Sequence, residues 1–260
     1  MTATEPPVLI LGGTGEAREL AAALVAEKIA CVSSLAGRVS DPALPVGEVR
    51  IGGFGGADGL ATWLTRHRCT TVVDATHPFA QQISRNAAEA TTATSAQLIS
   101  LRRPPWTPGP DDHWTVVADI GEAAAHVGTR VRRVFLTTGR QDVDEFAGID
   151  DSWFLIRVVD PPTGPLPHRH RVLRSRGPYR LDDEREIMRT NQIDTLVTKN
   201  SGGALTSAKL RAAADLGVEV VMVQRPAPPD RGHAVTSVDD AVLAVRAAIA
   251  GQVSTRQSSP

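Results

Sequence analysis

The residues with the clearest chemical meaning stand near the start of the chain. The apolar residues 8–11 run directly into Gly12-Gly13-Thr14-Gly15, and a helical pattern begins at Glu16. A buried strand, a glycine turn and a helix in this order are typical of a nucleotide-binding βαβ unit, in which glycines admit a pyrophosphate and the first helical turn offers N–H groups to it. We therefore predict that Gly12, Gly13, Thr14, Gly15 and Glu16 bind the pyrophosphate of a dinucleotide.

The match to the dinucleotide fingerprint is incomplete. In a G-x-G-x-x-G pattern that starts at Gly13, Arg18 stands in place of the third glycine. Glycine is also common in strand–helix turns that bind nothing, so a turn without a ligand is the alternative interpretation. No Gly-Lys-Ser/Thr follows the glycines, which disfavours a phosphate-binding P-loop.

The next strand indicates which dinucleotide is bound. An NAD site commonly carries an acidic residue about 20 positions after the glycines, where it holds the ribose diol. Here that segment reads Cys31-Val-Ser-Ser-Leu-Ala-Gly-Arg38, with two hydroxyls and a guanidinium but no carboxylate. We predict NADP(H) as the cofactor, with Ser33, Ser34 and Arg38 on its 2′-phosphate. A plain surface turn at Gly37-Arg38 is the alternative.

Two further loops follow predicted strands of the same half. Ligands of parallel sheets bind beyond the carboxyl ends of the strands. Gly52 and Gly53 follow one strand, and Thr76 and His77 follow another. We expect all four to flank the nicotinamide half of the cofactor. The alternatives are a flexible glycine turn and helix capping by Thr76 and His77.

The second half of the chain repeats the pattern with more cations. Lys199-Asn-Ser-Gly-Gly203 joins a strand to a helix, and such a turn can form an anion-binding concavity. Arg140 follows another strand, and arginines crowd residues 169–180. These loops indicate a polyanionic or polycarboxylate partner, although a solvated charged face is the alternative for most of 169–176.

Several familiar catalytic patterns are missing. Tyr179 is the only tyrosine and Asp183 stands four residues on, so the Tyr-x-x-x-Lys pair of short-chain dehydrogenases is absent. Neither GxSxG nor HExxH occurs. His168 and His170 lie in an arginine-rich loop, where solvation or anion binding is favoured over metal ligation, and we predict no metal site.

The alternation of strands and helices predicts an α/β fold of two Rossmann-like domains, each a parallel sheet flanked by helices, with the active site in the cleft between them. The proline-dense run 102–112 is the natural boundary. We expect an NADP(H)-binding domain over residues 1–105 and a substrate domain over 106–260. Its last helix should cover 238–249, followed by a disordered tail from 252.

The composition narrows the class of protein. A net charge of −1 gives no field for nucleic acid or anionic membranes. The chain shows no signal peptide and no apolar run long enough for a membrane span. Cys31 and Cys69 have apolar neighbours and read as core thiols, which suits the reducing cytoplasm. We expect a cytoplasmic monomer or weak homo-oligomer.

Six segments, in order over residues 8 to about 226, together resemble the precorrin-6A reductase family. They are 11–18 (LGGTGEAR), 33–38 (SSLAGR), 52–56 (GGFGG), 74–80 (DATHPFA), 137–140 (TTGR) and 199–203 (KNSGG). The resemblance implies NADPH-dependent reduction of precorrin-6A to precorrin-6B in cobalamin (vitamin B12) biosynthesis, with hydride added to C19 and a proton to C18 of the macrocycle. A related branch acts on the cobalt-containing precorrin. Two other hypotheses are a non-catalytic NADP(H)-binding sensor and an NADPH reductase of a different acidic substrate.

Within this family the second half would bind a tetrapyrrole polycarboxylate. We assign the substrate carboxylates to Arg140, Lys199, Ser201, Gly202 and Gly203. The proton donor stays open between Asp142, His77, Tyr179 and a water molecule.

Overall fold

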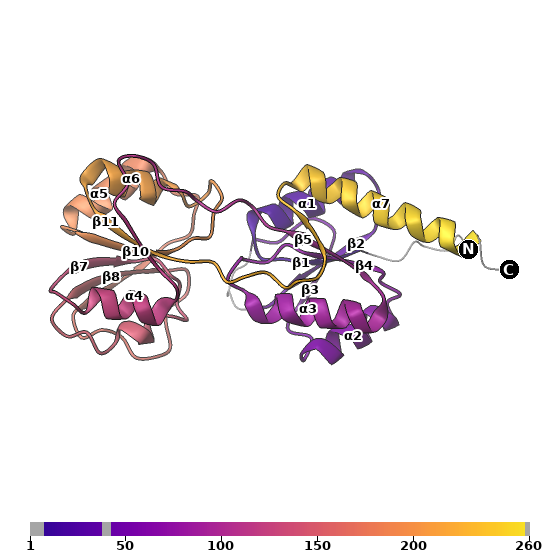
Figure 1. Cartoon of the computed structure of the whole chain (residues 1–260), viewed down its shortest axis with the longest axis horizontal. Helices are drawn as coiled ribbons and strands as arrows, with labels where there is room; N and C mark the ends of the chain where they lie inside the picture. Colours follow the sequence, from indigo (N-terminus) through magenta and orange to yellow (C-terminus); the bar gives the residue numbers. More distant parts are fainter. Residues whose placement is uncertain (1–7, 38–42, 258–260) are drawn as a thin grey trace. The chain divides into compact units, whose positions relative to one another are not determined.

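The computed structural model of the chain describes residues 8–37 and 43–257, with side chains as far as residue 251. Two compact units are present (Figure 1). The first unit contains the residues up to Arg103 together with those from Pro226 on, and the second contains Pro104–Arg225. The chain therefore returns to the first unit, whereas the expected division placed residues 226–260 in the second.

The first unit is built on a parallel sheet in the order β12-β5-β4-β1-β2-β3. Its strands are β1 (Val8–Leu11), β2 (Cys31–Leu35), β3 (Glu48–Ile51), β4 (Thr71–Asp74), β5 (Gln97–Leu101) and β12 (His233–Val235). Successive residues of β1 point to opposite faces. Val8 and Ile10 pack with α1 (Gly15–Ala26) and α7 (Val238–Gln257), while Leu9 and Leu11 pack with α2 (Ala57–Arg66) and α3 (Gln81–Thr94). The strand order reverses between β1 and β4.

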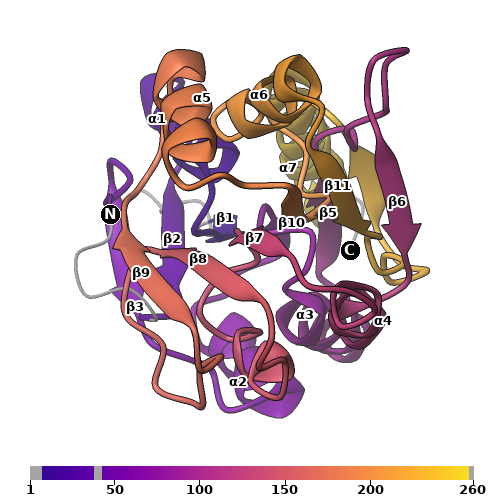
Figure 2. The same ribbon diagram turned by 90° about the vertical axis from the view of Figure 1, so that its left-hand side faces the viewer.

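The second unit repeats this plan with a parallel sheet in the order β6-β11-β10-β7-β8-β9, which can be followed across Figure 2. Its strands are β6 (Trp114–Val117), β7 (Arg133–Leu136), β8 (Trp153–Val158), β9 (His170–Arg174), β10 (Thr195–Lys199) and β11 (Glu219–Val223). One face packs with α5 (Leu181–Thr190) and α6 (Ala208–Leu216) through Phe135, Leu155 and Leu196. On the other, α4 (Ile120–Val127) lies beside the short helix η1 (Asp144–Phe146). Here the order reverses between β7 and β10. The expected α/β class with two Rossmann-like parallel sheets is confirmed.

One edge strand of each sheet pairs with a strand that is distant in sequence. β6 follows β5 in sequence, yet it pairs with β11 of the second sheet. β12 follows β11 in sequence, yet it pairs with β5 of the first sheet. α7 then packs on α1. This exchange is the physical reason why residues 226–260 belong to the first unit.

The end of the chain is more ordered than expected. α7 continues to Gln257, whereas we expected the helix to end at Ile249 and a disordered tail to begin at 252. No proline interrupts the helix before Pro260, and the single Gly251 costs only about 1 kcal/mol in a helix. Residues 258–260 lie outside the described part of the chain.

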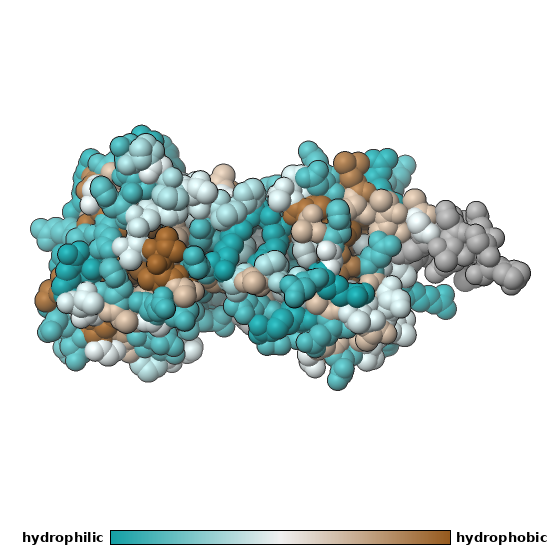
Figure 3. Space-filling view, in the orientation of Figure 1, coloured by the Kyte–Doolittle hydropathy of each residue, from teal (hydrophilic) through white to brown (hydrophobic). Residues whose placement is uncertain are grey.

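Within the described residues, no helix combines the length and apolarity needed to cross a bilayer. The face of the molecule drawn in Figure 3 is mostly hydrophilic, with apolar side chains in small patches on each unit.

A charged cluster joins the amino ends of β7 and β11. The Glu219 carboxylate accepts hydrogen bonds from Arg132 at 2.5 Å, His126 at 2.7 Å and Thr115 at 2.9 Å. Burial alone would raise the pKa of Glu219, but these three hydrogen bonds and the charge of Arg132 outweigh it and lower the pKa to about 2. Stability from this carboxylate is therefore present above the ordinary Glu pKa of about 4.3 and is lost as the pH falls toward 2.

We expect Glu219→Gln to lower the free energy of unfolding at pH 7 by about 2 kcal/mol, a value reduced for partial exposure of the group to solvent. The cost should shrink toward pH 3, because the wild-type carboxylate also becomes protonated. Urea denaturation at both pH values measures the difference. Glu145→Gln, at an exposed position, is the control. Equal, pH-independent losses in the two variants would contradict the role of the cluster.

Candidate active site

The loops after β1 and β4 meet at the switch point of the first sheet. Leu11 pairs with Asp74 at the ends of these strands. The Thr14 hydroxyl donates to the Ala75 carbonyl at 2.8 Å and accepts from the Ala17 N–H at 3.1 Å. Thr14 is buried and caps α1. Its side chain therefore shapes the turn, and cofactor binding by Thr14 stays a prediction.

The two first glycines of the turn have different roles. Gly12 donates its N–H to the Ser34 carbonyl at 2.9 Å, and a Cβ added there would make ordinary contacts of 3.5 Å with Ala17 and Leu35. Gly13 is exposed and has φ +112°, a conformation that favours glycine. No atom of the described residues lies within 4 Å of the place a Cβ would take there. Gly13 thus leaves an open surface of backbone beside Gly15, the first residue of α1.

Glu16, in the first turn of α1, has a cationic partner. Arg103 Nη1 lies 2.6 Å from Glu16 Oε2. Because a bare carboxylate would repel a pyrophosphate, this pairing makes an anion at the helix N-terminus more favourable. Arg103 lies 87 residues away in sequence, and no local pattern indicates it.

The hydroxyls of the predicted 2′-phosphate site separate onto opposite faces of β2. Ser33 is 2% exposed, and its Oγ has no hydrogen-bond partner among the described residues. It lines a small depression of about 10 Å³ with Gly12, Gly13, Arg18 and others. Ser34 instead accepts from Arg50 Nη1 at 2.8 Å. Arg38 lies outside the described residues.

Arg18 is a candidate that sequence reasoning missed as a ligand. It had counted only as the residue that interrupts the glycine pattern. In the structure it borders the same depression as Ser33. Its position could have indicated this role from the sequence. Arg18 lies in the first turn of α1, which packs beside β2, so its guanidinium can reach an anion bound beyond the end of that strand.

Arg50 organises the loop that contains Gly52 and Gly53. Its guanidinium donates to the carbonyls of Gly52 at 2.9 Å and Gly53 at 3.1 Å, and it stacks 3.8 Å from the centroid of the Phe54 ring. The loop is therefore held close to the end of β3. Gly52, with φ +118°, presents open backbone as Gly13 does.

The loop after β4 is fixed by Asp74. This carboxylate accepts from the Thr76 N–H at 3.1 Å, the Thr76 hydroxyl at 2.6 Å and the Ser84 hydroxyl at 2.5 Å. The Thr76 hydroxyl proton is therefore used within the loop. His77 is exposed, and its Nδ1 accepts from the Phe79 N–H at 3.3 Å, so a neutral His77 carries its proton on Nε2.

An equivalent pair of loops lies at the switch point of the second sheet. Lys199 ends β10, and its Nζ lies 2.5 Å from Asp142 Oδ2 in the loop after β7. The Thr137 N–H and hydroxyl both donate to the Val197 carbonyl at 3.0 Å. Gly139, with φ +97°, has open space at its Cα, and half-buried Arg140 follows it. Asp142 and Lys199, separately predicted, are thus brought together.

The 200–203 loop is held against the segment that enters the second unit. Asn200 accepts from the Trp106 N–H at 2.8 Å and donates to the Trp106 carbonyl at 3.0 Å. Trp106 Nε1 donates to the Gly203 carbonyl at 3.0 Å. A Cβ on Gly202 would lie 2.1 Å from the Pro104 carbonyl oxygen. Gly202 and Gly203 therefore allow this loop to pack against residues 104–106. Ser201, which precedes Gly202, is buried.

Tyr179 is held at the carboxyl end of β9. Its hydroxyl donates to the Ser175 carbonyl at 3.2 Å. The Arg157 guanidinium stacks 3.8 Å from the centroid of its ring and forms an ion pair with fully buried Glu184. The phenol proton is already used, so proton donation to a substrate would break this arrangement.

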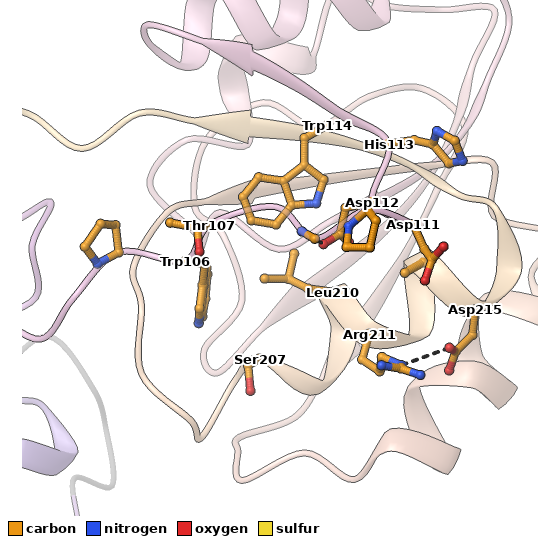
Figure 4. A pocket seen from close by; sticks show the side chains of 14 residues that line it. Trp106, Thr107, Asp111, Asp112, His113, Trp114, Ser207, Leu210, Arg211 and Asp215 are labelled. Carbon is orange, nitrogen blue, oxygen red and sulfur yellow. Dashed lines mark hydrogen bonds and ion pairs between the residues drawn. The ribbon is translucent and has the colours of Figure 1, made fainter.

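A groove of about 830 Å³ lies elsewhere in the second unit, between residues 105–114 and α6. Trp106, Trp114 and Leu210 border it, with Arg211 paired to Asp215 at the rim (Figure 4). Trp114 begins β6, so the groove extends toward the amino end of that strand. None of the site residues predicted from the sequence lines it.

These features define a class of two-unit α/β proteins with a dinucleotide-type turn in the first sheet and a cationic loop pair in the second. Comparison with known proteins specifies the class further. The chain belongs to the precorrin-6x reductase CbiJ/CobK family, whose model matches residues 7–246.

Individual relatives agree with the family. A precorrin-6A reductase from Rhodococcus erythropolis is 54% identical over 239 residues, which cover 92% of this chain and 95% of the relative. The solved structure of CobK precorrin-6A reductase superposes with a TM-score of 0.88 at 40% identity, covering 93% of this chain and 96% of that one. A cobalt-precorrin-6A reductase from Salmonella typhimurium is more distant, at 28% identity over 246 residues, or 86% and 89% of the two chains.

Proposed function

We propose that this chain reduces precorrin-6A to precorrin-6B with NADPH in cobalamin biosynthesis. The observation that carries the proposal is the open Gly13 turn at the switch point of the first sheet, in a member of a reductase family. Buried free thiols at Cys31 and Cys69 suit the cytoplasm, where we place the reaction.

The residues of the first unit fit NADPH. Gly13 leaves room for a pyrophosphate, and Arg103 offsets the charge of Glu16. The unpartnered hydroxyl of Ser33 and the guanidinium of Arg18 offer a donor and a cation for a 2′-phosphate. Gly52 and His77 follow the carboxyl ends of β3 and β4, two strands of the same sheet with β1 and β2 between them, and we assign both residues to the nicotinamide half.

We expect Arg18→Ala to weaken NADPH binding about 10- to 100-fold while changing NADH binding little, because a charge-assisted hydrogen bond contributes about 1.5–3 kcal/mol. Titration of both cofactors by fluorescence measures the two dissociation constants. Arg66→Ala, at an exposed position on α2, is the control. Equal losses for NADPH and NADH would refute the 2′-phosphate role. Arg38→Ala carries the same prediction from sequence alone.

The second unit is assigned to the substrate. When bound, NADPH would supply a hydride, which we assign to C19 of the macrocycle, and a proton would be added at C18. The chain itself orients the substrate, binds its carboxylates and delivers the proton. Arg140 and Lys199 are the cations at the switch point that we assign to these tasks.

Sequence identity favours the cobalt-free substrate. The relative named precorrin-6A reductase shares 54% of its residues with this chain, against 28% for the relative named cobalt-precorrin-6A reductase. We therefore propose metal-free precorrin-6A as the substrate.

Incubation of the purified chain with precorrin-6A and NADPH tests the function. We expect one NADPH to be oxidised for each precorrin-6A consumed, a product two hydrogens heavier, and slower turnover with NADH. Competition with the cobalt form shows which substrate has the higher kcat/KM. Tight NADPH binding without oxidation in the presence of authentic precorrin would instead support the sensor hypothesis.

A further inference from the structure

We propose that Lys199 is the acid that protonates the substrate carbon, and that Asp142 is its positioning residue. This inference rests on the proposed reductase function. It assigns the proton to a residue that sequence reasoning had treated only as a carboxylate ligand.

The position of Lys199 suits a reacting group. It is the last residue of β10, beside β7, at the point where the order of the second sheet reverses. Its side chain is 18% exposed, and that of Asp142 is 20% exposed. The 2.5 Å contact between Nζ and Oδ2 links the two loops that border the switch point, where ligands of such sheets bind. The ammonium is therefore held in a defined place and not on a free surface chain.

The contacts of Asp142 and Tyr179, the other candidates in the second unit, argue against each of them as the acid. In the ion pair, the ammonium holds the protons and the Asp142 carboxylate accepts. The Tyr179 hydroxyl donates to the Ser175 carbonyl. An ammonium has three N–H donors, and one of them contacts Asp142. Lys199 is thus the candidate in the second unit that can give up a proton while it stays in contact with Asp142, which orients it.

Substrate carboxylates have better ligands than Lys199. Asp142 already neutralises its charge, which weakens its attraction for another anion. Arg174, Arg176 and Arg180 are exposed in or just after β9, and none forms an ion pair within the described part of the chain. Guanidinium groups bind carboxylates with two parallel hydrogen bonds, a geometry that an ammonium cannot match.

The step balances. A hydride leaves C4 of the dihydronicotinamide and forms a C–H bond at C19, which oxidises NADPH to NADP⁺. The π electrons between C18 and C19 then form a C–H bond at C18 with a proton from Lys199 Nζ. The resulting amine regains a proton from water. The substrate gains two electrons and two hydrogens in total.

Lys199→Arg is the decisive variant, because arginine keeps the charge but does not release a proton. We expect kcat to fall at least about 100-fold, with KM for precorrin-6A and NADPH affinity nearly unchanged. Lys28→Arg, at an exposed position in the first unit, is the control and should match the wild type. Lys199→Arg with wild-type kcat would overturn the proposal and leave Lys199 as a charge anchor.

Amine rescue and Asp142→Asn distinguish three roles: Lys199 as the acid, Lys199 as an anchor for the substrate, and Asp142 as the acid. Methylamine should restore part of the kcat of Lys199→Ala in proportion to its concentration; an anchoring role predicts a raised KM and no rescue. Asp142→Asn should lower kcat less than Lys199→Arg does, and the reverse order would make Asp142 the acid and overturn the proposal. A wild-type chain that does not oxidise NADPH with precorrin-6A would refute the proposed function itself, which these variants do not test.

Discussion

Gly13→Asp is expected to weaken NADPH binding at least about 100-fold, since it combines lost access to the turn with direct charge repulsion. Gly13 has φ +112° and open space at its Cα, so a side chain there would occupy the volume assigned to the pyrophosphate. The aspartate carboxylate would also face phosphate oxygens of the same charge. Fluorescence titration with NADPH measures the effect directly, and kcat/KM for NADPH should fall in parallel.

The control for Gly13→Asp is Gly217→Asp. Gly217 ends α6 in the second unit with φ +64°, and no described atom lies within 4 Å of its Cβ position. This variant carries a similar backbone penalty of about 1 kcal/mol without meeting the cofactor. We expect some loss of stability and wild-type NADPH affinity. If Gly13→Asp bound NADPH as tightly as Gly217→Asp, the turn would not be the pyrophosphate site.

Arg157→Met is expected to lower the free energy of unfolding by about 3–5 kcal/mol, because it leaves a buried carboxylate without its cation. Glu184 is fully buried on α5, and Arg157 on β8 is its ion-pair partner. Glu184 Oε2 already lacks a hydrogen-bond partner among the described residues. Urea denaturation of the purified variant gives the change, which should appear as a lower midpoint with an unchanged slope.

Two further variants test the cause of this loss. Arg157→Met combined with Glu184→Leu removes both charges and should recover most of the stability. Arg185→Met removes two ion pairs nearer the surface, with Asp182 and Asp215, and it should cost far less stability than Arg157→Met. The buried pair would lose its assigned importance if the double variant stayed as unstable as Arg157→Met.

The repeated strand–turn–helix pattern was sufficient to predict the α/β class and its parallel sheets. It could not predict the partners of β6 and β12. These strands have only four and three residues, and periodicity shows that a segment is a strand without showing which sheet it joins. The pairing of β12 with β5 depends on tertiary contacts, and it places residues 226–260 with the first unit, whereas the expected division placed them in the second.

The candidate site also contains some features that the local sequence indicates and others that only the fold brings together. Gly13 could be found from sequence because its conformation and its place after a strand are local properties. The pairs Glu16–Arg103 and Asp142–Lys199 join residues 87 and 57 positions apart, and only the folded sheet brings them together. For the same reason, sequence alone could not show that Thr14, Gly202 and Tyr179 are occupied by contacts within the protein.

Transfer of deuterium from NADPH to the macrocycle tests whether this protein transfers a hydride to precorrin-6A. NADPH carrying deuterium at nicotinamide C4, prepared separately for each face of the ring, is incubated with the chain and precorrin-6A. We predict that one of the two preparations yields a product with one deuterium bound to a ring carbon, and that the other yields none. NADPH that is not consumed, or a product without deuterium from either preparation, would contradict hydride transfer by this protein.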